Sequence, residues 1–181
     1  MTESVAPRLA PLPEDRWDDA VREALSPLLP AERRNPRDAG NVLSTLLRNP
    51  ELTRGYLHFN AHLLLHSSLS ARVREVALLR AVQLRGCDYL WDHHIPIAER
   101  VGLTAADLDR IRAGDGTEEL DRLVVRAVDE IDRTHRLGAQ TWSALQVHFD
   151  ERQILDLLFT IGCYQSLAVA VNVLAVLPEQ H

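Results

Sequence analysis

A glutamate, a cysteine and a histidine follow one another in the middle of the chain. Glu75, Cys87 and His94 are separated by eleven and then six residues. If the segment from Cys87 to His94 is helical, a spacing of i and i+7 puts the thiol and the imidazole on one helix face. The histidine could act as a general acid or base near neutral pH, and the thiol is a possible nucleophile. The pattern therefore predicts a reactive cavity.

Each of these three residues also has a structural interpretation. Cys87 could be a small buried packing residue, because free cysteine is commonly buried and the acids beside it favour the neutral thiol. His94 could be a core imidazole bonded to a carbonyl. Glu75, in an apolar stretch, could be a half-buried acid with a raised pKa, or instead a helix-cap glutamate or one paired with Arg72 or Arg74. We keep both interpretations open for all three.

Neighbouring side chains are candidates for the lining of that cavity. Leu90 and Trp91 share the predicted helix face, and Tyr89 lies between them and the cysteine. Aromatic residues at these spacings are more often part of the core. Arg80 or Arg74 could hold a substrate carboxylate through two parallel N–H groups, although an exposed helical arginine is the commoner case.

Three histidines recur at every fourth residue of another predicted helix, at His58, His62 and His66. Imidazoles at i and i+4 can chelate zinc or another divalent ion. Three such ligands cannot all reach one ion, because i and i+8 lie about 12 Å apart along a helix. A solvated or interface stripe is the alternative, and no metal site is predicted.

Composition narrows the class of protein. The chain has 181 residues, 46% of them hydrophobic, which suits one domain with one core. A formal net charge of −6 argues against nucleic acid, because phosphate binding needs a clustered positive field. We expect no stretch of the roughly 20 apolar residues that span a bilayer, and therefore no membrane partner. Cys87 and Cys163 form no CxxC, which fits the reducing cytoplasm.

The residue types also exclude several mechanisms. All 20 basic residues are arginine, so Schiff-base chemistry, which needs a lysine amine, is excluded. The sequence contains neither GxGxxG nor GxxxxGK[ST], the glycine-rich motifs that hold dinucleotides and nucleoside triphosphates. We therefore expect no cofactor.

The elements that would position these residues are helices. Pro7, Pro11 and Pro13 predict an irregular arm over residues 1–13, followed by a single helical domain over 14–181. No segment alternates with period two between turn signals, so we predict an all-α bundle of about seven to nine helices. The expected helices cover residues 14–25, 42–48, 50–67, 71–84, 88–101, 105–112, 118–136, 140–149 and 151–176.

The segment RVREVALLRAVQLRGCDYLWDHHIPIAERVGLTAADLDRIRAG, residues 72–114, resembles the core of the carboxymuconolactone decarboxylase superfamily, whose other well-known branch is alkylhydroperoxidase D. The likeness extends over roughly residues 42–177. Its most specific signals are the Arg74–Glu75 pair, the YxW pair at Tyr89 and Trp91, and His94. The resemblance implies an all-helical, alkylhydroperoxidase D-like fold that assembles as trimers or hexamers, with pockets near subunit contacts.

The resemblance also implies roles for particular residues. The alkylhydroperoxidase branch carries a CxxC, a following histidine and an upstream glutamate that supports a proton relay, and Tyr164 lies at the family's GxY position. Glu75, Cys87 and His94 match three of the four relay positions. Leu90 stands where that branch has its peroxide-attacking cysteine, so the CxxC is incomplete and cannot cycle through a disulfide.

Three functions remain. The first is a cofactor-independent enzyme that performs acid/base chemistry of a decarboxylase, lyase or isomerase type on a small carbonyl or carboxylate substrate, with His94 and Glu75 handling protons. The second is a thiol-dependent peroxidase that uses Cys87, with Cys163 or an external thiol. The third is a non-catalytic ligand-binding or assembly module. In each case the expected partners are a small molecule and further copies of the chain, as a dimer, trimer or hexamer.

Overall fold

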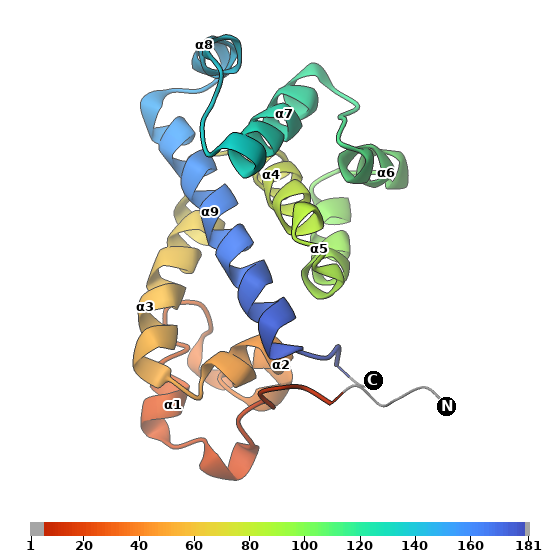
Figure 1. Ribbon diagram of the computed structural model, residues 1–181. Helices are drawn as coiled ribbons and strands as arrows, with labels where there is room; N and C mark the ends of the chain where they lie inside the picture. The colour runs from red at the N-terminus through yellow and green to blue at the C-terminus, as the bar shows by residue number, and fades with distance from the viewer. Residues whose placement is uncertain (1–5, 180–181) are drawn as a thin grey trace, which may run out of the picture. The chain divides into compact units, whose positions relative to one another are not determined.

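The computed structural model describes residues 6–179, and these contain helices and no strand (Figure 1). The predicted all-α class is confirmed. Contacts divide the described chain into two compact units, one of residues 6–66 with 170–179 and the other of residues 67–169. Of the predicted N-terminal arm, residues 6–13 form no helix, and residues 1–5 lie outside the described part.

The first unit consists of short helices. These are 3-10 turns at Glu14–Arg16 and Ala31–Arg33, α1 (Asp19–Glu23), α2 (Pro36–Leu46), α3 (Pro50–Ala61), a π-helical segment at His62–His66, and the end of α9. The continuous helix expected over residues 14–25 is wrong, because Trp17 leaves the helical region and Asp18 starts a new helix by accepting from the Val21 amide. Residues 36–39, expected as a loop, are helical up to Gly40, whose φ of 68° kinks α2.

The second unit is built around α4 (Ala71–Leu84), which is buried on most of its surface. It packs against α5 (Asp88–Arg100), α6 (Ala105–Ala113) and α7 (Glu119–Thr134). The unit is completed by α8 (Ala139–His148) and the first part of α9 (Glu151–Leu174). All of the predicted catalytic residues belong to this unit.

Local capping signals set the start of these helices as the sequence predicts. The Ser70 hydroxyl accepts from the Val73 amide at the start of α4. Thr104 and Asp107 form a reciprocal capping box at the start of α6. Pro96 lies inside α5, and the helix continues through it.

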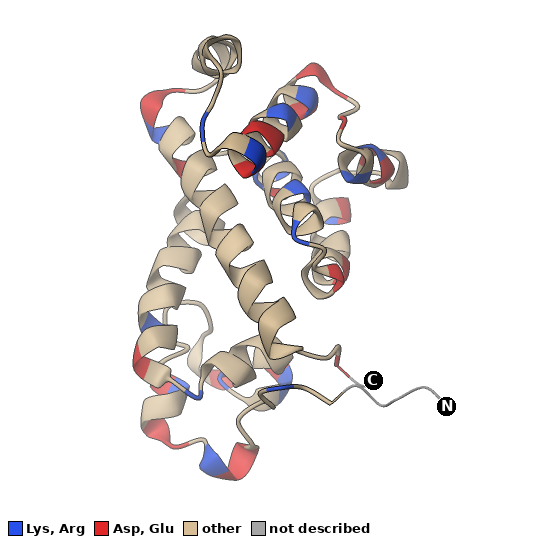
Figure 2. Ribbon diagram, viewed as in Figure 1, with Lys and Arg blue, Asp and Glu red and all other residues tan. Residues whose placement is uncertain are grey.

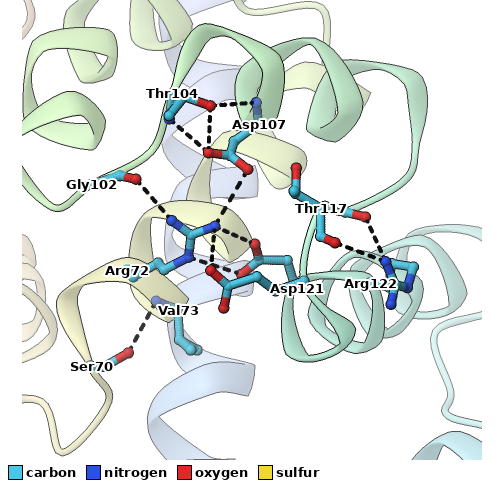
Figure 3. A network of polar contacts seen from close by, with 11 residues as sticks. Ser70, Arg72, Val73, Gly102, Thr104, Asp107, Thr117, Asp121 and Arg122 are labelled. Carbon is cyan, nitrogen blue, oxygen red and sulfur yellow. Dashed lines mark hydrogen bonds and ion pairs between the residues drawn. The ribbon is translucent and has the colours of Figure 1, made fainter.

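Arg72, in the first turn of α4, is the centre of a network of acids (Figure 3). Its guanidinium donates to Asp121 of α7 at 2.6 and 3.4 Å and to the Gly102 carbonyl at 3.0 Å. It lies 3.5 Å from Asp107 of α6 and 3.4 Å from Glu118. These acids, foremost the hydrogen-bonded Asp121, raise the pKa of Arg72. One cation thus links α4 to α6, α7 and the loop that ends α5.

We expect the Arg72 network to make stability depend on acid pH. Burial raises the pKa of Asp107, but hydrogen bonds from Thr117 and Thr104 and the charge of Arg72 outweigh it and lower the pKa from 3.8 to about 2. A carboxyl with a lowered pKa stabilises the fold above its unfolded pKa, and this contribution, about 2 kcal/mol, is lost as the pH falls from about 4 to 2. Urea unfolding measured across that range should show the loss.

A matched pair of variants isolates this effect. Asp107→Asn should reduce the pH dependence below about pH 4, whereas Asp109→Asn, at an exposed position of the same helix, should keep it. An unchanged pH dependence in Asp107→Asn would contradict the assignment.

A second arginine of α4 fixes the turn between α6 and α7. The Arg80 guanidinium donates to both carboxylate oxygens of Asp129, at 2.6 and 3.1 Å, and to the carbonyls of Ile111 and Arg112. Gly114 ends α6 with a φ of 86°, and a β-carbon there would lie 3.0 Å from an Arg80 nitrogen. The turn is therefore packed against a buried ion pair.

The helix α9 is almost without charge after its second turn (Figure 2). It is the one helix of the described chain that is long and apolar enough to cross a membrane, which corrects the expectation that no stretch would reach that length. Half of its most apolar window is buried in the protein, and core helices of soluble proteins pass the same test. This single helix is therefore weak evidence for a membrane.

Candidate functional site

Glu75 of α4 and His94 of α5 meet in the interior of the second unit. Glu75 Oε2 lies 2.9 Å from His94 Nδ1, and their side chains are 0% and 6% exposed. An ionised carboxylate can only accept, so with Glu75 in that form Nδ1 donates this hydrogen bond. The second ring nitrogen, Nε2, is then left to take up or give a proton. The structure thus joins the two residues to which the sequence assigned proton transfer.

The aromatic ring of Tyr164 covers His94 from α9. The two ring centroids are 5.3 Å apart and the rings stand nearly perpendicular, at 88°. Tyr164 is 2% exposed, so the imidazole is shielded from water on this side. The resemblance suggested that Tyr164 contacts substrate, and this stays a prediction.

The other oxygen of Glu75 faces an arginine without a hydrogen bond. Glu75 Oε1 and Arg74 Nε are 3.8 Å apart, and both atoms are buried. Among the described residues neither atom has a hydrogen-bond partner. Of the two arginines considered for pairing with Glu75, Arg74 is therefore the neighbour, and Arg72 belongs to the acidic network. A carboxylate oxygen and an N–H group, both buried and both with unused bonding capacity, are unusual in a protein interior.

Cys87 is on the same helix as His94 but does not join this pair. Its seven-residue separation from His94 corresponds to about 10 Å along a helix. No hydrogen bond links the thiol to Glu75 or His94 within the described chain. Cys87 is the N-cap of α5, with φ −98° and ψ 83°, so its sharing a helix face and a cavity with His94 stays a prediction.

The surroundings of Cys87 favour the neutral thiol. The residue is 1% exposed at the N-cap of α5. Burial raises the pKa of Cys87, a backbone hydrogen bond with Leu90 opposes the rise, and the charge of Asp88 adds to it. Since the thiolate is the nucleophile, Cys87 is poorly prepared for attack at neutral pH.

We predict that Cys87 reacts slowly with thiol reagents. In a Cys163→Ser background, iodoacetamide should alkylate native Cys87 more slowly than N-acetylcysteine from about pH 7 to 10, with a midpoint above that of the free thiol. Mass spectrometry after denaturation in urea should then show full labelling. A midpoint below that of N-acetylcysteine would contradict the prediction.

The remaining predicted lining residues have other partners. Leu90 and Trp91 are buried, and the Arg112 guanidinium lies 4.4 Å from the centroid of the Trp91 ring. Tyr89 is partly exposed and stacks on His93 at 6.3 Å. These contacts are typical of core packing and a helix surface.

The predicted carboxylate-binding role of Arg80 has little support. Its guanidinium is occupied by Asp129 and two carbonyls, which leaves one of its five N–H groups without a described partner. Arg74, the alternative, has its Nε buried and without a hydrogen-bond partner beside Glu75. It is therefore the better candidate for holding an anion.

The histidine stripe is exposed at all three positions, His58, His62 and His66. The first lies in α3 and the others bound the π-helical segment. Residues 6–179 contain no group of three or more histidine, cysteine, aspartate or glutamate side chains that could hold a metal ion. The exposure of these side chains fits a solvated or interface stripe.

A cavity of about 800 Å³ lies away from the predicted residues. It is lined from α7, α8, α9 and the linker between α7 and α8, and it contains none of the predicted catalytic residues. Sequence reasoning missed it, because residues such as Arg136 and Trp142 belong to no motif. The sequence signal that could have indicated it is an arginine, Arg136, followed by the apolar Leu137.

The part of the chain that matches a known protein family contains the helices of Glu75 and His94. Residues 50–129 match the model of the carboxymuconolactone decarboxylase family. This range includes Glu75, Cys87 and His94 but not Tyr164. Comparison with curated protein sequences gave no match.

Several crystal structures are similar over nearly the whole chain. A peroxidase-related protein from Silicibacter sp. is 18% identical, with a TM-score of 0.78 and coverage of 99% of this chain and 95% of its own. A peroxidase-related protein from Ralstonia eutropha, with an alkylhydroperoxidase core, is 16% identical, with a TM-score of 0.77 and coverage of 97% and 95%. The apo debrominase Bmp8 is 14% identical, with a TM-score of 0.66 and coverage of 94% and 91%. At these identities the likeness shows a shared fold.

Proposed function

Because the chain belongs to the carboxymuconolactone decarboxylase superfamily, with the alkylhydroperoxidase D-like fold, we propose that it is a cofactor-independent acid/base enzyme acting on a small carbonyl or carboxylate substrate. The observation that carries the proposal is the hydrogen bond between Glu75 and His94, 2.9 Å long and shielded from water. Two groups that handle protons are in contact there, whereas the Cys87 thiol, at the N-cap of α5, has no described hydrogen bond to either.

In the proposed reaction His94 Nε2 removes a proton from carbon next to the substrate carbonyl. Glu75, as acceptor of the Nδ1 proton, stabilises the imidazolium that forms and keeps the ring in the required orientation. The electron pair moves into an enolate. In an isomerisation the proton then returns to a different carbon. In a decarboxylation no carbon-bound proton is removed first: the bond to the carboxylate breaks, its electron pair forms the enolate as carbon dioxide leaves, and protonated His94 gives its proton to that carbon.

Arg74 is the proposed partner for an anionic group of the substrate. Its side chain is 14% exposed, and its Nε lies beside the Glu75 oxygen without a hydrogen bond. A substrate carboxylate on Arg74 would be held close to the Glu75–His94 pair. Such a charge-assisted contact would also compensate a buried cation that the described protein leaves without a hydrogen bond.

Proton transfer can be tested directly with a panel of 2-oxo and 3-oxo carboxylic acids and lactone carboxylates in deuterium oxide. Nuclear magnetic resonance should show that the wild type incorporates deuterium next to the carbonyl, or releases carbon dioxide, for at least one member. His94→Asn should lower that rate about 10²- to 10⁴-fold, the usual contribution of a general base. Glu75→Gln should also lower it, because the amide no longer stabilises the imidazolium.

His93→Asn is the matched control, since this exposed histidine is the direct neighbour of His94. It should keep the wild-type rate, as should Cys87→Ala. Circular dichroism would confirm that each variant is folded. Full turnover in His94→Asn would rule out the proposed role.

A thiol-dependent peroxidase is the second candidate, because Cys87 keeps one cysteine of the family's redox motif and lies on the helix of His94. The raised pKa of this thiol and the leucine at position 90 disfavour it. We predict negligible consumption of cumene hydroperoxide with dithiothreitol as reductant, with no change in Cys87→Ser. Rapid consumption abolished by Cys87→Ser would instead establish the peroxidase.

The proposed enzyme is a cytoplasmic homo-oligomer. Cys87 and Cys163 are both buried thiols, in keeping with a reducing compartment. Large apolar side chains are exposed at Leu52, Leu65 and Val147, and contacts with further copies would cover such surface. These observations favour a dimer, trimer or hexamer without deciding the number of subunits.

A further inference from the structure

The cavity bounded by α7, α8 and α9 has the lining of a ligand site. Its volume of about 800 Å³ lies within the range of roughly 300–1,000 Å³ found for small-ligand pockets. Its apolar lining includes Ile131, Leu137, Trp142 and Leu158, and Arg136 is the only charged residue of its lining apart from the titratable His135. We propose that this groove binds a small carboxylate with an apolar chain, and that Arg136 holds the carboxylate.

The acid closest to this linker is already engaged. α7 ends at His135 with a φ of 59°, and Glu130 then holds the following chain by accepting from the Thr141 hydroxyl at 2.6 Å and the Gly138 amide at 2.8 Å. These two hydrogen bonds lower the pKa of Glu130. The carboxylate is therefore used to fix the linker that carries Arg136.

The second nearby acid is engaged as well. Asp132 Oδ1 lies 2.6 Å from the Arg85 guanidinium and accepts from Gln165 Nε2 at 3.1 Å. Arg136, by contrast, makes no side-chain hydrogen bond or ion pair with any described residue. The groove thus offers one positive charge without an ion-pair partner beside apolar side chains. This arrangement matches a ligand that has a carboxylate and an apolar chain.

A second copy of this chain is the competing occupant, because Leu155 and Phe159 of α9 are also exposed. The charge of Arg136 argues against it. Between Asp156 and the end of α9 there is no acidic residue. Asp156, between Leu155 and Phe159, is buried and already accepts hydrogen bonds from Ser67 and Ser68. Packing this part of α9 from another copy into the groove would therefore bury the Arg136 guanidinium without a carboxylate partner, which costs free energy.

Tryptophan fluorescence gives a direct readout of binding. Trp142 is 40% exposed, whereas Trp17 and Trp91 are 6% and 2% exposed, so acrylamide quenching reports mainly on the groove. Octanoate should protect Trp142 from acrylamide in a saturable manner. Octan-1-ol and octylamine should bind about tenfold more weakly, because they lack the charge-assisted hydrogen bond to Arg136.

Two variants separate charge from shape. Arg136→Gln should weaken octanoate binding about tenfold and remove its advantage over octanol, whereas Arg133→Gln, at an exposed arginine outside the groove, should keep both. Gly162→Leu should block all three probes by filling the groove. A β-carbon at Gly162 meets nothing within 4 Å, so this variant should fold normally, which circular dichroism would confirm.

Two results would overturn the proposal. One is equal protection by octanoate, octanol and octylamine, or no protection by octanoate. The other is protection of Trp142 that rises with protein concentration without any probe, together with a heavier species in sedimentation that Gly162→Leu abolishes. That result would assign the groove to a second copy. Proton transfer by His94 is unaffected by either outcome, because the groove shares no residue with the Glu75–His94 pair.

Discussion

The burial of α4 is the constraint on which the second unit depends. In a helix enclosed on most sides, ionisable side chains are largely withdrawn from water and need partners inside the protein, and only Arg74 of the described helix keeps a buried Nε without a hydrogen bond. Arg72 and Arg80 find aspartates of α7, and Glu75 finds His94 of α5. The charges of one helix therefore determine which neighbours pack against it and in what register.

The same burial also sets how the Glu75–His94 pair could handle a proton. In a water-poor interior a hydrogen bond between carboxylate and imidazole is strong and geometrically fixed, and the second ring nitrogen remains available. Leu90 stands where the similar redox branch has a cysteine, and burial raises the pKa of the remaining Cys87 thiol, whereas the glutamate and the histidine are both present. A fold shared with peroxidase-related proteins is therefore compatible with different chemistry.

Sequence predicted the features that depend on local interactions. The bounds of α4, the Ser70 cap and the capping box at Thr104 each follow from a few adjacent residues. Sequence-based prediction failed where contacts between residues far apart in the chain determine the structure. The helix break at Trp17 follows from burial of that ring in the first unit, and the partners of Arg80 come from α6 and α7. Periodicity treated Cys87 as helical, whereas it is the non-helical N-cap of α5, and it contained no information on the separation of thiol and imidazole along the axis.

The turn at Gly114–Gly116 connects two helices as an ordinary surface turn does, yet its two glycines leave no room for side chains. Turns of this kind usually accept insertions and new side chains as sequences diverge. Here one glycine lies against the Arg80 guanidinium, and a β-carbon on the other would lie 2.4 Å from the Arg122 amide nitrogen. A graft or insertion at this turn would separate α6 from α7, so an engineer should choose another loop and an evolving lineage should keep the GDG sequence.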